Sequence, residues 1–149
     1  MFGVLRRKTK NFVRMPWHIK WLFAEAVWTT EYVKITLLFL PFKKVAGWLG
    51  TSRQVRADSI SAGQPDLVKN IRFAIKICDK YTPWPTECYT RALTAKIMLK
   101  RRQMASTLYF GFCKDDTGQL KGHAWLQCSG LIVTGFCDFS KYEVHSSFS

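Results

Sequence analysis

Residues 86–113 read TECYTRALTAKIMLKRRQMASTLYFGFC, and within this stretch the spacing of the apolar side chains changes from helical to strand-like. Thr86 is a residue type that caps helices, and apolar residues follow it at helical spacing to about Gln103. From Ser106 to Cys113 the apolar positions recur with a period of two, which predicts a strand. A helix that leads directly into a strand predicts a mixed fold rather than an all-helical one.

The rest of the chain adds helices before this stretch and strands after it. Apolar periodicity and the Pro and Gly positions predict helices over 16–40, 41–49 and 66–80, and strands over 120–128, 131–136 and 142–148. Residues 51–63 are polar and aperiodic, which is typical of a linker. We therefore expect an α+β fold in which a helix packs on a small antiparallel sheet.

The chain has 149 residues, a formal charge of +13 and a sequence pI near 9.8. Residues 1–56 carry eleven Lys and Arg against two acidic residues, whereas residues 57–149 carry twelve against eight. This asymmetry predicts a basic, apolar helical N-terminal extension over 1–56 and a core domain over 57–149. We expect no nucleic-acid partner, because no motif that reads nucleic acid accompanies the basic residues.

The apolar stretch from Trp21 to Leu40 has the length of a membrane span but not its composition. It contains Glu25, Glu31 and Lys34, and each charge near a bilayer centre costs roughly 2.5–3.5 kcal/mol. We expect an amphipathic or buried helix here, and no signal peptide, because no small-residue cleavage site follows the basic N-terminus. Lys and Arg beside Trp and Phe also suit a membrane interface, so peripheral contact through residues 1–56 stays open.

The cysteines form no CxxC pair and no zinc-type spacing, which predicts free thiols. There are five: Cys78, Cys88, Cys113, Cys128 and Cys137. Because the count is odd and a secretory signal is not apparent, we expect a reducing, cytoplasmic location, with contact to the inner face of the membrane left open. We expect neither a metal ion nor a cofactor.

Cys88 differs from the other cysteines because it falls in the first turn of a predicted helix. The unpaired backbone N–H groups and the helix dipole there favour an anion, such as a thiolate or the oxyanion that forms when a thiolate attacks an amide. The position therefore favours a nucleophile. The alternative is that Cys88 is a small buried residue on the apolar face of the helix.

A nucleophilic thiol needs a base, and His123 is the candidate. Strand alternation places His123 and Trp125 on one face, with Ala124 and Leu126 on the other. If the face with His123 and Trp125 turns toward the helix of Cys88, then Cys88 and His123 form a dyad, and Trp125 provides a hydrophobic wall beside it. The alternative is a core histidine with satisfied hydrogen bonds.

Four segments together resemble one protein family. They read Pro83-Trp84-Pro85-Thr86-Glu87-Cys88 with Arg91-Ala92-Leu93, then Ser106-Thr107-Leu108-Tyr109-Phe110-Gly111, His123-Ala124-Trp125-Leu126, and Val133-Thr134-Gly135. In content and order these segments resemble the transglutaminase-like leader peptidases of lasso-peptide biosynthesis, the microcin-processing protease family. The resemblance covers residues 64–149 and, more loosely, residues 40–50. It implies a papain-like or transglutaminase-like cysteine protease core.

The resemblance also implies roles for individual residues. Cys88 would be the nucleophile and His123 the base that later protonates the leaving amine. The third member in the family is an acid on the strand after the histidine strand, but residues 133–136 hold no carboxylate. Asp138, slightly further along, is therefore the candidate. The alternatives are that Asp138 is only a turn residue, and that a backbone carbonyl or no partner at all orients His123.

The implied reaction is removal of the leader from a ribosomally made precursor peptide. The implied partners are that precursor, a separate leader-recognition protein and an asparagine-synthetase-like cyclase. The first 60 residues are helical and do not resemble the β-containing leader-recognition domain that some members carry. Three other readings stay open: a non-catalytic peptide-binding or scaffold member of the same fold, a membrane-associated basic adaptor, and a related thiol transferase or deamidase.

Overall fold

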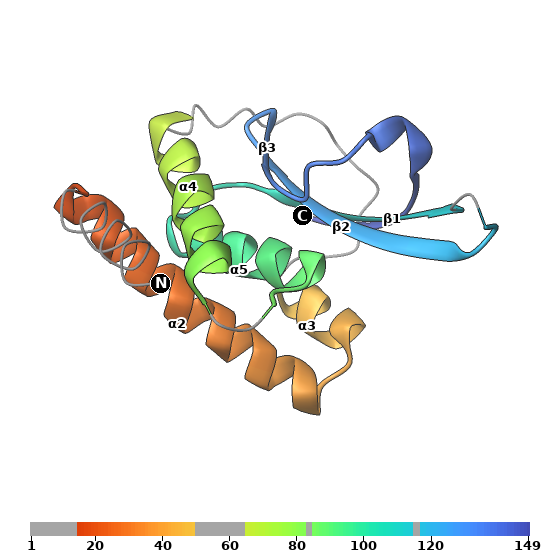
Figure 1. Cartoon of the computed structure of the whole chain (residues 1–149), viewed down its shortest axis with the longest axis horizontal. Helices are drawn as coiled ribbons and strands as arrows, with labels where there is room; N and C mark the ends of the chain where they lie inside the picture. Colours follow the sequence, from red (N-terminus) through yellow and green to blue (C-terminus); the bar gives the residue numbers. More distant parts are fainter. Residues whose placement is uncertain (1–14, 50–64, 83–84, 115–116) are drawn as a thin grey trace, which may run out of the picture.

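The computed structural model describes residues 15–49, 65–82, 85–114 and 117–149. Its elements in chain order are α2 (Trp17–Phe39), α3 (Phe42–Leu49), α4 (Pro65–Tyr81), α5 (Cys88–Arg101), β1 (Thr107–Lys114), β2 (Leu120–Cys128), β3 (Leu131–Thr134), the 3-10 helix η1 (Phe139–Lys141) and β4 (Glu143–Phe148) (Figure 1). The strands form one antiparallel sheet in the order β3-β2-β1-β4. The helices precede the sheet, which confirms the predicted α+β fold.

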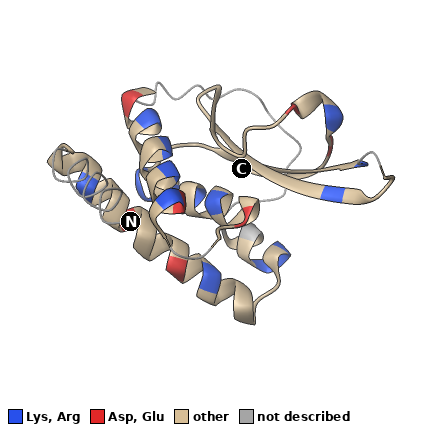
Figure 2. Cartoon of the chain, viewed as in Figure 1, with Lys and Arg blue, Asp and Glu red and all other residues tan. Residues whose placement is uncertain are grey.

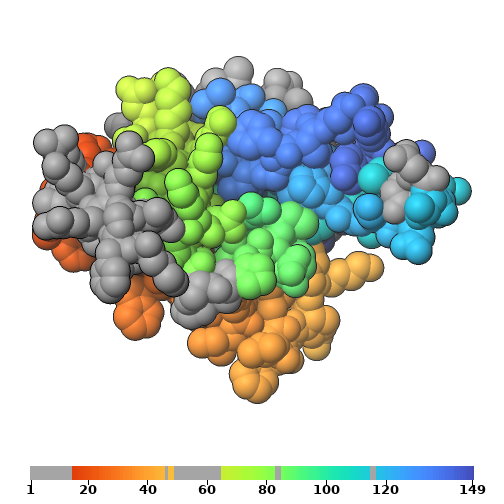
Figure 3. All heavy atoms as spheres, viewed as in Figure 1, coloured from red at the N-terminus to blue at the C-terminus, as the bar shows by residue number. Residues whose placement is uncertain are grey.

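Helix α5 lies at the centre of the molecule. It packs against α2 and α4 on one side and against β1, β2 and β3 on the other (Figures 1 and 3). Ala92 and Ala95 are completely buried, and these small side chains let neighbouring elements approach the α5 backbone closely. Leu93 and Leu99, also completely buried, fill the remaining space. The position of α5, and therefore of its first residue, is fixed by packing on both sides.

Helix α2 confirms the long helix predicted between two prolines. Pro16 occupies the N-cap position with an extended ψ of 146°, and Leu40 is extended at the C-cap, as expected for a residue before proline. One side of α2 is buried, through Ile19, Leu22 and Ala26 among others. No helix in the described ranges is long and apolar enough to cross a membrane.

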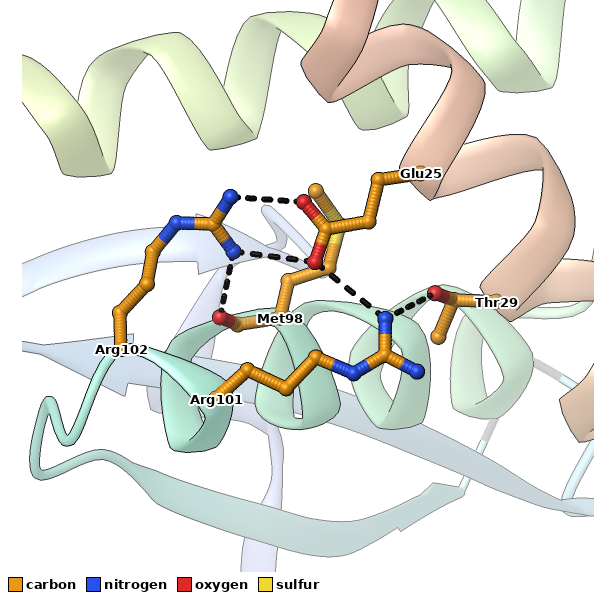
Figure 4. A network of polar contacts seen from close by, with 5 residues as sticks. All are labelled: Glu25, Thr29, Met98, Arg101 and Arg102. Carbon is orange, nitrogen blue, oxygen red and sulfur yellow. Dashed lines mark hydrogen bonds and ion pairs between the residues drawn. The ribbon is translucent and has the colours of Figure 1, made fainter.

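A charged network joins α2 to the end of α5 (Figure 4). Glu25 accepts hydrogen bonds from both guanidinium groups, at 2.7 and 3.0 Å from Arg102 and 3.3 Å from Arg101. Arg102 also donates to the carbonyl of Met98, and Arg101 donates to the Thr29 hydroxyl. Burial by itself raises the pKa of Glu25, but the hydrogen bonds and charges of the two arginines outweigh it and hold that pKa below its ordinary value. The network therefore stabilises the packing of α2 on α5.

The buried face of α2 belongs to the same hydrophobic core as α4, α5 and the sheet. Val33, Ile71, Leu93 and Leu126 are members of that single cluster, although they come from four different elements. The proposed boundary between residues 56 and 57, and the linker predicted over 51–63, lie outside the described residues. The described part of the predicted N-terminal extension therefore packs onto the core domain that the sequence predicted over 57–149.

The strands follow the predicted order with one correction. The fourth strand, predicted at 142–148, is β4, and it pairs with β1 at the sheet edge. The third strand was expected to reach Phe136 but ends at Thr134, because Gly135 takes a positive φ of 76° that turns the chain out of the sheet. Pairing of β3 with β2 consequently stops at Leu126 and leaves the edge of β2 at His123 without a neighbouring strand.

Candidate active site

Cys88 is the first residue of α5. The N-cap residue is Glu87, whose side chain makes no capping hydrogen bond, so the prediction that Thr86 caps this helix is wrong. The Thr86 hydroxyl instead donates to the carboxylate of Asp79 on α4. Helical geometry leaves the first backbone N–H groups of α5 without intrahelical partners. The half-buried Cys88 side chain therefore lies beside donors that can bind developing negative charge.

Asp79 connects the end of α4 to the start of α5. Its carboxylate accepts from Thr86 and also pairs with Arg91 at 2.9 Å, one helical turn after Cys88. The Asp79–Arg91 ion pair joins α4 to α5, the helices before and after the connection that contains residues 83 and 84. Asp79 and Arg91 thus fix the N-terminal turn of α5, and with it the position of Cys88.

Cys88 and His123 line one cavity of about 210 Å³. The other residues that line it are aromatic or small: Phe42, Tyr89, Phe110, Gly111, Phe112, Gly122 and Ala124. The Phe42 ring contacts the Phe110 ring at 4.4 Å between centroids, so α3 closes one side of the cavity. The structure thus brings the predicted nucleophile and the predicted base to the same apolar-walled space.

His123 lies on β2 directly opposite Gly111 of β1. Its ring contacts those of Trp125 and Tyr142, at 6.2 and 5.3 Å between centroids, which confirms that His123 and Trp125 share a face. This is not the face packed on α5, because Ala124 and Leu126 occupy that position in the hydrophobic core. On the face with His123, the Trp125 ring contacts Phe139 of η1 and Tyr142, which precedes β4. His123 nevertheless lines the cavity that contains Cys88, together with residues of β1.

The Nε2 atom of His123 lies 3.1 Å from the carbonyl oxygen of Gly135. A carbonyl oxygen only accepts, so Nε2 carries the proton in this hydrogen bond. In the neutral ring Nδ1 is then unprotonated and able to accept a proton. Gly135 suits this position because its φ is positive and a Cβ there would collide with the backbone of Ala124 and Trp125.

The hydrogen bonds and ion pair of Asp138 lie within its own turn. Its carboxylate accepts from the backbone N–H of Ser140 at 3.3 Å and from the Ser140 hydroxyl at 2.6 Å, and it pairs with Lys141 at 3.8 Å. The Ser140 hydroxyl is the main reason why the pKa of Asp138 lies below its ordinary value, with a smaller contribution from Lys141. Asp138 therefore caps η1, while the carbonyl of Gly135 holds the ring of His123.

A second cavity, of about 320 Å³, is also lined by His123 and was not anticipated from the sequence. It is lined by Arg72, Ile75, Lys76 and Asp79 from α4, Arg91 from α5, His123 from β2, and Val133, Thr134, Gly135 and Phe136 from β3 and the residues after it. The polar members are spread along the sequence from Arg72 to Thr134, so only the packing of α4, α5 and the sheet brings them together. In the part of the chain that the structure describes, no three His, Cys, Asp or Glu side chains form a group that could hold a metal ion.

A sequence model of one family matches this chain over residues 36–147, which include the end of α2, α3, α4, α5 and nearly all of the sheet. That family is described as the transglutaminase-like superfamily. Searches of curated proteins and of solved structures gave no significant match. Because the matched region covers most of the chain, and includes both Cys88 and His123, the chain belongs to the transglutaminase-like superfamily.

Proposed function

We propose that this chain is a cysteine peptidase in which Cys88 is the nucleophile and His123 the base. The observation that supports it most is the shared cavity: Cys88, at an uncapped helix N-terminus, and His123, oriented by a backbone carbonyl, line the same space. Membership of a superfamily with this core agrees with thiol chemistry. The Gly135 carbonyl fills the orienting role that the sequence suggested for Asp138.

The proposed reaction has two halves. In the first, the Cys88 Sγ attacks the scissile carbonyl carbon while Nδ1 of His123 takes the thiol proton. The oxyanion forms beside the free N–H groups at the start of α5, and the C–N bond breaks as His123 returns the proton to the leaving amine. In the second half, His123 deprotonates a water that attacks the thioester, which releases a carboxylic acid and restores the thiol.

We propose as substrate the leader junction of a ribosomally made precursor peptide, as in the family of leader peptidases that the sequence resembles. The aromatic walls of the Cys88 cavity, from Phe42, Tyr89, Phe110 and Phe112, suit an apolar side chain beside the scissile bond. Leader recognition would come from a separate protein, and a cyclase would take the product onward.

The decisive experiment is cleavage of a peptide library of defined sequences by the full chain and by its Cys88→Ala variant, with new termini identified by mass spectrometry. We expect cleavage by the wild type and none by the variant. The Cys113→Ser variant is the matched control, and it should cleave as the wild type does. Equal cleavage by wild type and Cys88→Ala would contradict the proposal, and amine-linked rather than hydrolysed products would assign a transferase instead.

Thiol labelling tests the nucleophile without a substrate. Burial raises the pKa of the Cys78 and Cys128 thiols, and burial followed by the charge of Asp138 raises that of Cys137. These three thiols should therefore react slowly with iodoacetamide at neutral pH, since the thiolate is the reactive form. We expect Cys88 to be labelled first, and His123→Ala to slow that labelling. Faster labelling of Cys113 than of Cys88 would contradict the assignment.

The outward face of α2 supports a second role, peripheral contact with an anionic membrane. Trp28 is 79% exposed and Phe39 is 81% exposed, and Trp17, Trp21 and Tyr32 are exposed as well. Trp and Tyr at an outward surface, in a sequence segment rich in Lys and Arg, are typical of helices that lie in a membrane interface. We propose that this face contacts lipid headgroups and the acyl boundary.

Co-sedimentation of the full chain with phosphatidylglycerol-containing vesicles tests this contact. We expect binding that falls with added salt and that the double variant Trp21→Ser, Trp28→Ser loses. Phe73→Ser, which removes an exposed aromatic side chain from α4, is the matched control and should leave binding unchanged. Binding that the double variant retains would contradict the role of α2, and absence of binding by the wild type would contradict membrane contact altogether.

A further inference from the structure

The second cavity beside His123 holds polar atoms whose hydrogen-bonding capacity is unused. The side-chain Nε of Arg91 and the Oγ1 of Thr134 are both fully enclosed, and neither has a hydrogen-bond partner within the described structure. Thr134 is only 6% exposed. Buried donors are normally satisfied, because an unpaired one has lost its hydrogen bonds to water without a replacement. Arg91 and Thr134 both line the same cavity, and their unused hydrogen-bonding capacity beside it indicates a ligand that brings polar atoms to this site.

The charges around the cavity specify the ligand further. Arg72, Lys76 and Arg91 contribute three positive charges, and Asp79 contributes one negative charge. Asp79 is already engaged by Arg91 and by the Thr86 hydroxyl, so its oxygens are occupied. Lys and Arg recur at intervals along α4, as Figure 2 shows. Two of them, Arg72 and Lys76, line the cavity. The excess of cations and of unused donors favours an anion with paired acceptor oxygens.

Arg72 is held at this cavity by Phe136. Its guanidinium carbon lies 4.1 Å from the centroid of the Phe136 ring, a cation–π contact that leaves the edges of the guanidinium available for hydrogen bonds. Phe136 directly follows Gly135, whose carbonyl orients His123. The cationic cavity and the base are thus linked through two consecutive residues.

We propose that this cavity is a binding subsite for a carboxylate of the peptide substrate, an Asp or Glu side chain close to the scissile bond. The proposal rests on the peptidase function proposed above, because His123 lines both this cavity and the one that contains Cys88. A peptide placed with its scissile bond at Cys88 passes His123, and an acidic side chain on it enters the cationic cavity. Arg72 and Arg91 pair with the carboxylate, and Thr134 donates its unused hydroxyl proton.

The test measures binding rather than cleavage, and uses the Cys88→Ala chain so that turnover plays no part. Three probes are titrated against it by NMR chemical shift: N-acetyl-glutamate N-methylamide, the glutamine equivalent, and N-acetyl-alanine with a free terminal carboxylate. We expect the glutamate probe to bind at least tenfold more tightly than the glutamine probe, with shifts at Thr134 and Gly135. Preference for the alanine probe would assign a terminal carboxylate and overturn the side-chain assignment.

Two variants make the result specific. Thr134→Val keeps the shape of the side chain and removes a hydroxyl that has no partner, so its melting temperature should stay the same or rise while glutamate binding weakens about tenfold. Arg72→Met should weaken glutamate binding by a similar factor, whereas Lys69→Met, on the same helix but outside the cavity, should not. Equal binding of glutamate and glutamine, or full binding by Thr134→Val, would overturn the proposal. Because cleavage is not measured, binding without peptidase activity would leave this site standing and refute only the function.

Discussion

The ring of His123 is held by the backbone of Gly135, with 3.1 Å between Nε2 and the carbonyl oxygen. This relationship sets the tautomer of His123, the proposed base, because a carbonyl oxygen accepts a hydrogen bond and never donates one. It also replaces the side-chain acid that a Cys–His pair commonly uses for the same purpose. The acid nearest to Gly135 in the sequence, Asp138, is exposed and hydrogen-bonded to Ser140.

Asp138 should therefore contribute little to catalysis. We expect Asp138→Asn to retain kcat/KM for peptide cleavage within about twofold, and His123→Ala to lose roughly 10²–10⁴-fold, the usual contribution of a general base. The kcat/KM of each variant is measured from initial rates on the same substrate peptide. A loss in Asp138→Asn as large as that in His123→Ala would show that the carboxylate, not the carbonyl, orients the ring.

Gly135 should tolerate no side chain. Gly135→Ala adds a Cβ that collides with Ala124 and Trp125 and forces alanine to a φ of 76°, so it should destabilise the fold and lower activity. Gly130 has nearly the same φ, 75°, but open space around it, which makes Gly130→Ala the matched control. We expect Gly130→Ala to cost about 1–2 kcal/mol in urea unfolding, and Gly135→Ala at least about 2 kcal/mol more. Equal losses would contradict the close packing of Gly135 on β2.

The Glu25 network should stabilise the chain only while Glu25 is ionised. Because the folded-state pKa lies below the ordinary value of 4.5, its contribution is complete above that pH and is lost as the pH falls through the folded-state pKa. Glu25→Gln should lower the free energy of unfolding by about 1–3 kcal/mol at pH 7, since it leaves Arg102 without its partner. The difference between wild type and variant should shrink in acid.

Asp66→Asn is the control for this comparison. Asp66 pairs with Lys69 on the surface of α4, at 3.4 Å and with both side chains largely exposed, so its removal should cost under about 0.5 kcal/mol. If Glu25→Gln cost no more than Asp66→Asn, or if its effect were the same at pH 3 and pH 7, the network would not hold α2 on α5.

Because of Lys96, the fold should be more stable at mildly alkaline pH than at neutral pH. Burial, followed by the charge of Lys100, lowers the pKa of Lys96 to about 8, although its ammonium donates to the carbonyls of Ser106 and Phe148. Between pH 8 and 10.5 the unfolded chain keeps this proton and the folded chain releases it, so stability rises with pH. Relative to Lys96→Met, the free energy of unfolding of the wild type should increase by about 3 kcal/mol from pH 7 to pH 10.5. A pH-independent difference in urea unfolding would contradict this.

The order of helices and strands was readable from the sequence because apolar periodicity reports which side of each element is buried. Cys88 at a helix start and His123 on a strand were readable for the same reason. The predicted capping role of Thr86 was wrong, because its hydroxyl donates instead to Asp79, seven residues earlier. No local signal shows that Gly135 turns the chain and presents its carbonyl to His123.

The second cavity and the outer face of α2 depend on tertiary packing. Arg72, Arg91 and Thr134 come from three elements, and their meeting is decided by how α4 and α5 pack on β3. Helix α2 carries large apolar residues on both sides, so the sequence predicted an amphipathic or buried helix without showing which side faces the core. Only the structure distinguishes its core side from the side that carries Trp28 and Phe39.

The most direct test of the central claim is the mass of the chain during turnover. The wild type is mixed with a peptide that it cleaves, and the reaction is quenched in acid within the first turnover. The intact mass of the chain should increase by the mass of the acyl fragment. Digestion should then place that thioester on Cys88. Cys88→Ala should show no adduct, and Cys113→Ser should show the same adduct as the wild type. Peptide cleavage that proceeds with no acyl group on Cys88, or with the acyl group on another residue, would contradict the account.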